Sequence, residues 1–195
     1  MARGRSRKTA GEGSDFGARV RRLRDDASMT LEDLAKASGV SRAMLSKVER
    51  GEKNPTIAVG SRIARGLGAS FSTLAGAEAD HRDVAVIRRR ERLAFRDPES
   101  GFERHLLSPT LAGRAIEFVL HVIPPKAGSG ALPAYPAGTG KYLVVDKGRL
   151  RVTIGGKPTT LETGDALYFE ADVAHSFANA GDSICRYYLV VARRP

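Results

Sequence analysis

The chain has 195 residues, more than a single domain commonly has, so we expect two small domains or one domain with an appendage. Its 32 lysines and arginines against 22 aspartates and glutamates give a net charge of +10, which favours a polyanionic partner. The one cysteine, Cys185, excludes an internal disulfide and fits a reducing cytosol. No stretch reaches the roughly twenty apolar residues of a membrane span, and the N-terminus lacks the apolar core of a secretion signal. We therefore expect a cytoplasmic protein without a membrane partner.

Residues 1–14 are basic, small and glycine-containing and show no hydrophobic period, so we predict a disordered basic arm. Two interpretations of this arm stay open. It lies along the phosphates of DNA, as basic arms do, or it is only a solvated tail.

Residues 15–75 show the apolar spacing of helices and are predicted to form four or five short ones. Three hydroxyl residues, Thr30, Ser41 and Ser70, are placed to cap helix starts by accepting hydrogen bonds from backbone N–H groups of the first turn. Glycines mark helix ends, because a left-handed backbone conformation costs least at glycine. These glycines are Gly39, Gly51 and Gly68, and the periodic apolar positions are Phe16, Val20, Leu23, Leu31, Leu34, Ala35, Leu45, Val48, Ile57, Ile63, Ala64 and Leu67.

The stretch from Thr30 to Arg50 has helix-turn-helix spacing, because a capped helix, a tight glycine turn and a second capped helix follow one another. In the second helix Leu45 and Val48 face inward, which leaves a small outer face rich in donors. Such a face suits phosphates and guanine acceptors in the major groove. The alternative is a cationic, solvated face on a small helical bundle. The outer face consists of Arg42, Ala43, Ser46, Lys47 and Arg50.

Residues 16–74 resemble the DNA-binding domain of the phage-repressor (XRE) helix-turn-helix family. The match runs through "LEDLAKASGVSRAMLSKVERGEKNPT", and "RIARGLG" supplies the fourth helix. The resemblance implies a double-stranded DNA operator as partner. It also implies a structural pair between Arg24 on the first helix and Glu49 near the end of the recognition helix.

The same resemblance implies which positions contact DNA: the recognition helix reads bases and the loop after it touches phosphate. Many relatives hold a phosphate with a glutamine at the start of the second helix, where this chain has Leu31. We therefore expect Thr30 and the helix N-terminus to present N–H groups to that phosphate. The predicted DNA-contacting residues are Thr30, Ser41, Arg42, Ala43, Ser46, Lys47, Arg50, Lys53 and Asn54.

Residues 76–92 are polar and charged and are predicted to be a linker that leads into an edge strand. Two interpretations of its run Arg88–Arg90 stay open. The run contacts DNA, or it is solvated, and the second interpretation is favoured. Many short β-rich runs with turn signals between them and no long helix predict an all-β sandwich or barrel over residues 93–195. The β-rich runs are "DVAVI", "RLAF", "FERHLLS", "AIEFVLHVI", "KYLVV", "RLRVTI", "PTTLE", "ALYFE", "HSFAN" and "SICRYYLVVA".

This C-terminal half resembles a cupin, a double-stranded β-helix of the jelly-roll type. Gly164, His175 and Asn179 in "GDALYFEADVAHSFAN" match the second cupin motif. The first motif normally supplies two histidines and a glutamate, but here the glutamate position is Lys141 and residues 134–137 contain no histidine. One imidazole beside an ammonium does not hold a divalent ion, so we predict no metal, no cofactor and no catalytic residue. His105 and His121 lie on other predicted strands and are expected to be packed or surface residues.

A lysine that faces the barrel interior is costly to bury without a partner, so a neighbouring carboxylate or a ligand should neutralise Lys141. We hypothesise that Tyr135, Lys141 and His175 form the polar end of an apolar pocket for a small effector, a carboxylate or another anionic metabolite. The alternative is a polar core that is satisfied internally and binds nothing.

These observations favour a transcriptional regulator in which a helix-turn-helix binds DNA and a cupin senses an effector. The cupin resemblance implies a homodimer, and a two-fold protein favours half-sites separated by multiples of roughly 10 bp. Two alternatives stay open. One is a metal-dependent cupin enzyme with a helical accessory domain, and the other is an interaction module that has lost DNA binding.

Overall fold

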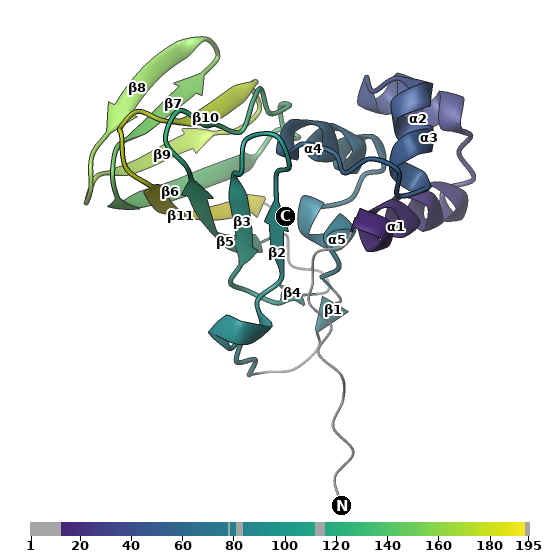
Figure 1. Ribbon diagram of the computed structural model, residues 1–195, viewed down its shortest axis with the longest axis horizontal. Helices are drawn as coiled ribbons and strands as arrows, with labels where there is room; N and C mark the ends of the chain where they lie inside the picture. Colours follow the sequence, from purple (N-terminus) through teal and green to yellow (C-terminus); the bar gives the residue numbers. More distant parts are fainter. Residues whose placement is uncertain (1–12, 78, 81–83, 112–115, 194–195) are drawn as a thin grey trace, which may run out of the picture.

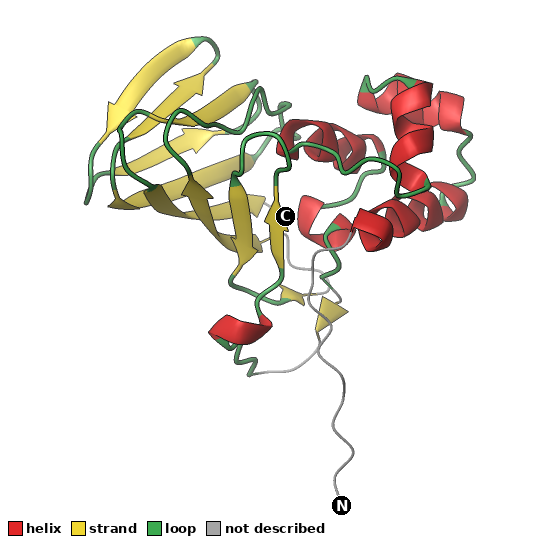
Figure 2. Ribbon diagram, in the orientation of Figure 1, coloured by secondary structure: helices red, strands yellow, loops and turns green. Residues whose placement is uncertain are grey.

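The structure, a computed structural model, describes residues 13–193 except 78, 81–83 and 112–115. A helical unit lies beside a β-barrel, as Figures 1 and 2 show. The arrangement confirms the predicted fold class, an all-α N-terminal part followed by an all-β C-terminal part. Residues 1–12 of the predicted disordered arm lie outside the described residues, and the prediction is wrong for Gly13 and Ser14, which belong to the first helix. Within the described residues, no helix is both long and apolar enough to cross a membrane.

Three helices of the N-terminal unit start at the predicted caps Thr30, Ser41 and Ser70, whereas α4 starts at Thr56, which was not predicted. The Thr30 hydroxyl accepts from the Asp33 N–H while the Asp33 carboxylate accepts from the Thr30 N–H, which forms a capping box at the start of the second helix. Gly39, at φ +66°, ends that helix in the left-handed conformation. Ser41 and Ser70 accept from the N–H groups of Met44 and Thr73. The α-helices of the described chain are α1 (Gly13–Asp26), α2 (Leu31–Ser38), α3 (Arg42–Glu49), α4 (Ile57–Gly66) and α5 (Phe71–Leu74).

The core of the helical unit consists of the apolar positions that recur at helical spacing. Leu34, Leu45 and Ile63 are fully buried in it. At its edge the Arg24 guanidinium donates to both carboxylate oxygens of Glu49, at 2.7 and 2.9 Å, and to the Met29 carbonyl oxygen at 2.8 Å. This bidentate pair joins α1 to α3, so the pairing of Arg24 with Glu49 that the family resemblance implied is confirmed.

The barrel consists of a six-stranded sheet in the order β2-β3-β5-β11-β6-β9 and a three-stranded sheet in the order β10-β7-β8, both antiparallel. Side chains along β6 alternate between the interior and the outer face, with Lys141, Leu143 and Val145 inside. Phe102, Phe177 and Tyr187 fill the interior. The strands are β2 (Ala94–Arg96), β3 (Glu103–Leu106), β5 (Ile116–Ile123), β6 (Thr139–Lys147), β7 (Leu150–Ile154), β8 (Lys157–Leu161), β9 (Ala166–Glu170), β10 (His175–Asn179) and β11 (Cys185–Arg193).

The connection between the units differs from the prediction. The alternating valines of "DVAVI" predicted a strand, but residues 84–88 form none and Val84 is 78% exposed. No described strand pairs with this segment, so the alternation alone does not produce a strand. A 3-10 helix (Arg89–Glu91) follows. A short parallel pair, β1 (Ala79–Asp80) with β4 (Thr110–Leu111), was not predicted.

The two units share a packed interface on the side of α1, α4 and α5. Phe95 of β2 lies with its ring centroid 5.8 Å from that of Phe16 and 5.0 Å from that of Phe71. The Ile57 N–H at the start of α4 donates to the Asp97 carboxylate at 2.7 Å. A carboxylate at this position satisfies one free N–H and suits the positive end of the helix. The barrel therefore holds α4 and α5, whereas α2 and α3 lie at the far side of the helical unit (Figure 1).

Candidate nucleic-acid interface and barrel site

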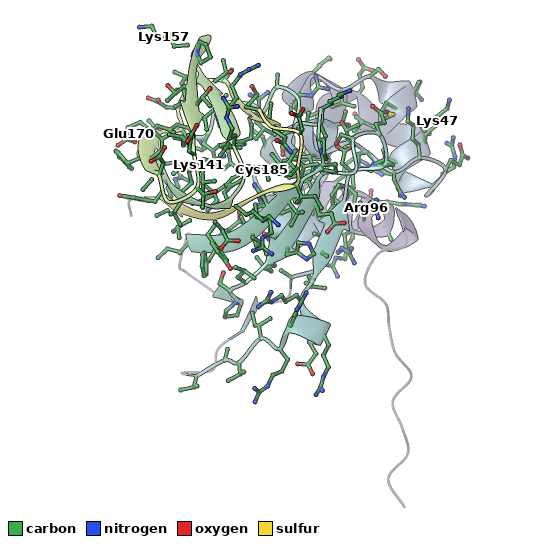
Figure 3. The ribbon with its side chains drawn as sticks, turned by 60° about the vertical axis from the view of Figure 1, so that its left-hand side comes forward. Lys47, Arg96, Lys141, Lys157, Glu170 and Cys185 are labelled. Carbon is green, nitrogen blue, oxygen red and sulfur yellow. The ribbon has the colours of Figure 1, made fainter. Side chains whose placement is uncertain are left out.

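The outer face of α3 points away from the barrel. Arg42, Ala43 and Lys47 are exposed on it, and Leu45 and Val48 are buried on the opposite face. In Figure 3 Lys47 projects from the side of the helical unit that is remote from the barrel residue Lys141. No described part of the barrel covers this face, so a nucleic acid has room to approach it.

The cations around α3 fall into two groups. Arg42, Lys47 and Lys53 form no ion pair with any described residue. Arg50 donates to both carboxylate oxygens of Glu52, at 2.6 and 3.0 Å, and also to the Ser46 hydroxyl. The hydrogen bonds from Arg50 hold the pKa of Glu52 below its usual value. The unpaired group is the one whose charge is available to a polyanion.

Ser41, Thr30 and Asn54 occupy different positions relative to this face. The Ser41 side chain caps α3 at the edge of the face, and Asn54 is exposed in the following loop. Thr30 caps α2, where its hydroxyl donates to Asp33 at 2.6 Å and its N–H donates to the same carboxylate oxygen at 2.9 Å. The expected donation from Thr30 to a phosphate therefore competes with an internal partner. The sequence reasoning missed this because it did not consider the third residue of the helix.

Inside the barrel the structure brings the predicted residues Tyr135, Lys141 and His175 together. The Lys141 Nζ lies 2.7 Å from the His175 Nε2 and 4.4 Å from the centre of the Tyr135 ring. The His175 Nδ1 lies 2.9 Å from the Val173 carbonyl oxygen, which only accepts, so this nitrogen bears the proton. The neutral ring therefore offers its Nε2 lone pair to the Lys141 ammonium.

Burial changes the protonation of this cluster. Lys141 is only 2% exposed, and burial, aided by repulsion from Arg104, lowers its pKa to about 7. Burial and the Lys141 charge lower the pKa of His175 to about 4. Burial raises the pKa of Tyr135 to about 12. Near neutral pH the ring of His175 is thus uncharged, and Lys141 is shared between its charged and uncharged forms.

The donor set does not fit the metal that cupins commonly hold. The one imidazole nitrogen available as a ligand, His175 Nε2, faces an ammonium, and the aromatic rings of Phe169 and Phe177 lie beside it. No group of three or more histidine, cysteine, aspartate or glutamate side chains in the described part of the chain is arranged to hold a metal ion. His121 is packed in the interior against Tyr187, and His105 pairs with Glu103, so neither histidine lies beside His175.

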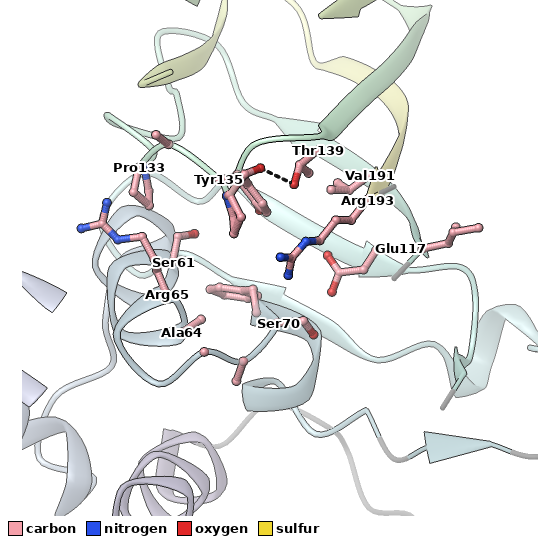
Figure 4. A pocket seen from close by; sticks show the side chains of 16 residues that line it. Ser61, Ala64, Arg65, Ser70, Glu117, Pro133, Tyr135, Thr139, Val191 and Arg193 are labelled. Atoms are coloured by element: carbon pink, nitrogen blue, oxygen red, sulfur yellow. Dashed lines mark hydrogen bonds between the residues drawn. The ribbon is translucent and has the colours of Figure 1, made fainter. Parts of the chain in front are cut away.

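A cavity of about 330 Å³ lies between the helical unit and the barrel, and the sequence reasoning missed it. Tyr135 is part of its wall, whereas Lys141 and His175 are not. Figure 4 shows Arg193 and Glu117 reaching towards its middle from the barrel. No sequence signal marks it, because segments far apart in the chain supply its lining. The lining residues are Ser61, Ala64, Arg65, Gly68, Ala69, Ser70, Phe71, Ile116, Glu117, Pro133, Ala134, Tyr135, Pro136, Thr139, Val191 and Arg193.

Comparisons with known proteins agree with both halves of the fold. Residues 20–74 match the family model described as helix-turn-helix, and residues 119–191 match the one described as cupin domain. The chain is 28% identical to the HTH-type transcriptional regulator SutR of Escherichia coli (strain K12) over 177 residues, which cover 88% of this chain and 91% of SutR. It is 39% identical over 58 residues, 30% of this chain and 75% of the relative, to the uncharacterized HTH-type transcriptional regulator y4dJ of Sinorhizobium fredii (strain NBRC 101917 / NGR234).

Solved structures share the arrangement of both halves. A crystal structure of an HTH_3 family transcriptional regulator from Vibrio cholerae is similar with a TM-score of 0.77 and 25% identity, over 94% of this chain and 98% of that one. The iron(II) protein HppE is similar with a TM-score of 0.50 and 21% identity, over 92% of this chain and 99% of that one. The second likeness shows a shared fold alone.

Proposed function

This chain belongs to the XRE-type helix-turn-helix transcriptional regulators with a C-terminal cupin domain, and we propose that α3 reads its operator while the barrel binds a small effector. The observation that supports operator reading is the face of α3, where Arg42, Ala43 and Lys47 are exposed and the two cations are unpaired among the described residues. Small and cationic side chains at the start of a helix suit contacts with base edges and phosphates in a major groove. Ser41, Ser46, Arg50, Lys53 and Asn54 are proposed to contact the backbone around it.

Selection of binding sites from random double-stranded DNA tests this function. Purified full-length protein should enrich a motif, and the enrichment should persist at a second, higher salt concentration. Attraction to phosphate alone weakens steeply with salt and carries no sequence preference. A selected pool that equals the input pool at both salt concentrations would contradict the proposal.

We propose that the protein is a homodimer joined through the outer face of the six-stranded sheet. Exposed apolar side chains gather there on neighbouring strands, with Tyr142 52% exposed. Such a continuous apolar patch is uncommon on a monomer, and a second copy would cover it. Sedimentation analysis should find a dimer, and Tyr142→Glu should dissociate it; a wild-type monomer at micromolar concentration would contradict the proposal. The patch consists of Ile116, Phe118, Tyr142, Val144 and Tyr168, with Tyr188 and Val190 between them.

We propose further that the barrel has no catalytic role and that the effector acts through the cluster Tyr135, Lys141 and His175. The poor fit of this cluster to a divalent ion supports a binding role over metal chemistry, even though the fold is shared with HppE. Elemental analysis of purified protein tests this, since stoichiometric iron or another transition metal would contradict it.

We propose that the protein is cytoplasmic. We also propose a DNA-binding domain over residues 15–75, a linker over 76–92 and the cupin domain over 93–195.

A further inference from the structure

The cavity between the two units joins the element that binds DNA to the element that is proposed to sense an effector. Its floor and one side come from α4 and α5, and its other side comes from β5, β11 and the loop 133–136. Its volume of about 330 Å³ lies within the range of small-molecule sites. A molecule bound there would touch both units at once.

The charged groups of this cavity leave an excess of positive charge. Arg65 of α4 and Arg193 of β11 line it and form no ion pair with any described residue. The third charged group, Glu117, lies 2.7 Å from the Arg104 guanidinium, which compensates its charge. Although burial acts to raise the pKa of Glu117, the Arg104 guanidinium holds it below its usual value. The carboxylate thus stays ionised, with Oε2 paired to Arg104 and Oε1 buried without a hydrogen-bond partner, and the two arginines outweigh its single charge.

The rest of the wall is mainly apolar. Ala64, Phe71 and Val191 are buried side chains of this wall, and Pro133 and Pro136 lie opposite α4. Tyr135 contributes to the wall and also packs on Lys141, whose Nζ lies 4.4 Å from the Tyr135 ring. A ligand that suits this lining has an apolar body and one anionic group.

We propose that this cavity binds a small organic carboxylate, with its anionic group on Arg193 and its apolar body against Phe71 and Tyr135. In Figure 4 the Arg193 guanidinium lies inside the cavity, whereas Arg65 lies along its rim near Pro133. Arg193 therefore binds the carboxylate, and Arg65 adds a weaker attraction. The regulatory part of this inference rests on the proposed effector sensing. The ligand reaches the proposed cluster through Tyr135, which lines the cavity, whereas Lys141 and His175 lie behind that ring and do not line it.

Packing contacts of Phe71 and α4 connect the cavity wall to the helices that support α3. The Arg104 guanidinium of the barrel lies 5.4 Å from the centre of the Phe71 ring, and the Phe16 ring of α1 lies 5.9 Å from it on the helical side. On the helix before it, Gly66 approaches Ser38 of α2 so closely that a Cβ at position 66 would lie 2.9 Å from the Ser38 Cβ. A ligand that changes the spacing of α4 and α5 from the barrel therefore changes the packing of α1 and α2, and α3 packs against both of these helices.

The test measures binding of benzoate, phenylacetate and hexanoate to full-length protein without DNA, by calorimetric titration. Uncharged benzamide is the matched control ligand. Arg193→Gln and Arg65→Gln remove the cations, and Ala69→Phe fills part of the cavity from its half-buried wall. Arg151→Gln is the matched control variant, because Arg151 is an exposed arginine of β7 that does not line the cavity.

We expect at least one acid to bind with a Kd below about 1 mM and benzamide to bind about tenfold more weakly or worse. Arg193→Gln should weaken the binding of that acid about tenfold, because its guanidinium reaches towards the middle of the cavity. Arg65→Gln should weaken it about threefold, because Arg65 lies at the rim. Ala69→Phe should abolish binding, and Arg151→Gln should leave it unchanged. Failure of all three acids to bind below about 1 mM, or binding that neither Arg193→Gln nor Ala69→Phe weakens, would overturn the site.

The regulatory part is tested with the operator obtained by selection. A saturating concentration of the acid should change the operator affinity of the wild type but not that of Arg193→Gln. An acid that binds in the cavity and leaves operator affinity unchanged would overturn the coupling. Operator binding measured without any acid tests the proposed function separately, so the two failures are distinguishable.

Discussion

A buried cation of the helical unit and a buried cation of the barrel have main partners that differ in charge. In the helical unit the Arg24 guanidinium meets the carboxylate of Glu49 at 2.7 and 2.9 Å. In the barrel the Lys141 ammonium meets the neutral ring of His175 at 2.7 Å. A guanidinium does not lose its proton in proteins, whereas burial lowers the pKa of Lys141 to about 7. A constant ion pair therefore joins α1 to α3, and a titratable contact lies inside the barrel.

The largest expected loss of stability comes from breaking the ion pair of Arg24 with Glu49. Glu49→Ala should lower the free energy of unfolding of the helical unit by about 2–3 kcal/mol, because Arg24, 12% exposed, loses its bidentate partner and keeps only the more exposed Asp25 at 2.7 Å. Chemical denaturation followed by circular dichroism measures the loss. Glu52→Ala is the matched control, since its pair with Arg50 is exposed and should contribute less than about 1 kcal/mol. Equal losses in the two variants would contradict the structural role of the Arg24–Glu49 pair.

The next expected effect is a pH dependence of stability, which the contact of Lys141 with His175 should produce and the pair of Arg24 with Glu49 should not. The folded protein releases the Lys141 proton near pH 7, whereas the unfolded chain keeps it until about pH 10.5. Between these values the unfolded state binds more protons, so rising pH favours the folded state by up to about 1.4 kcal/mol per pH unit. This contribution is lost as the pH falls towards 7.

Lys141→Met should remove that dependence. Denaturation curves of wild type and variant at pH 7, 8 and 9 measure it, and their difference isolates Lys141 from other titrating groups. Lys157→Met, at an exposed lysine of β8, should keep the wild-type slope. A slope that survives in Lys141→Met would show that the lysine keeps its ordinary pKa. On the acidic side, the lowered pKa of His175 should make stability fall as the pH drops from about 6.5 to about 4.

The sequence predicted best what neighbouring residues determine. Helix caps such as Ser41 and Ser70 and terminal glycines such as Gly39 act within a few residues, so their spacing sufficed. The strands of the barrel could be predicted from alternation, but "DVAVI" shows the limit of that signal: pairing needs a partner strand, which alternation does not specify.

Contacts between the two units could not be predicted in this way. Asp97 holds the start of α4 across forty positions of sequence, and Arg65 of the helical unit and Arg193 of the last strand line the same cavity. Only the arrangement of the complete fold brings such residues together. The cluster of Tyr135, Lys141 and His175 was predicted because the cupin resemblance fixed their positions in its two motifs, but the closed contact of Lys141 with His175 depends on packing.

The unpaired cations of α3 give the third effect, on operator binding instead of stability. Lys47→Ala and Arg42→Ala should each weaken operator binding by about 1–3 kcal/mol if they read bases, and change unfolding little. Arg50→Ala should cost less because Glu52 already holds that guanidinium. Electrophoretic mobility shifts with the selected operator measure the three variants side by side. Unchanged binding in both Lys47→Ala and Arg42→Ala would contradict the assignment of this face.

The smallest effect concerns Thr30, where helix capping and DNA contact compete for the same groups. Its hydroxyl and its N–H both face the Asp33 carboxylate, at 2.6 and 2.9 Å. If capping is its main role, Thr30→Ala should lower the free energy of unfolding by about 1 kcal/mol and alter operator affinity by less than about 0.5 kcal/mol. Thr30→Ser keeps a capping hydroxyl and should restore stability. The opposite result, normal stability with weakened operator binding in Thr30→Ala, would mean that the hydroxyl turns from Asp33 to a phosphate when DNA is bound.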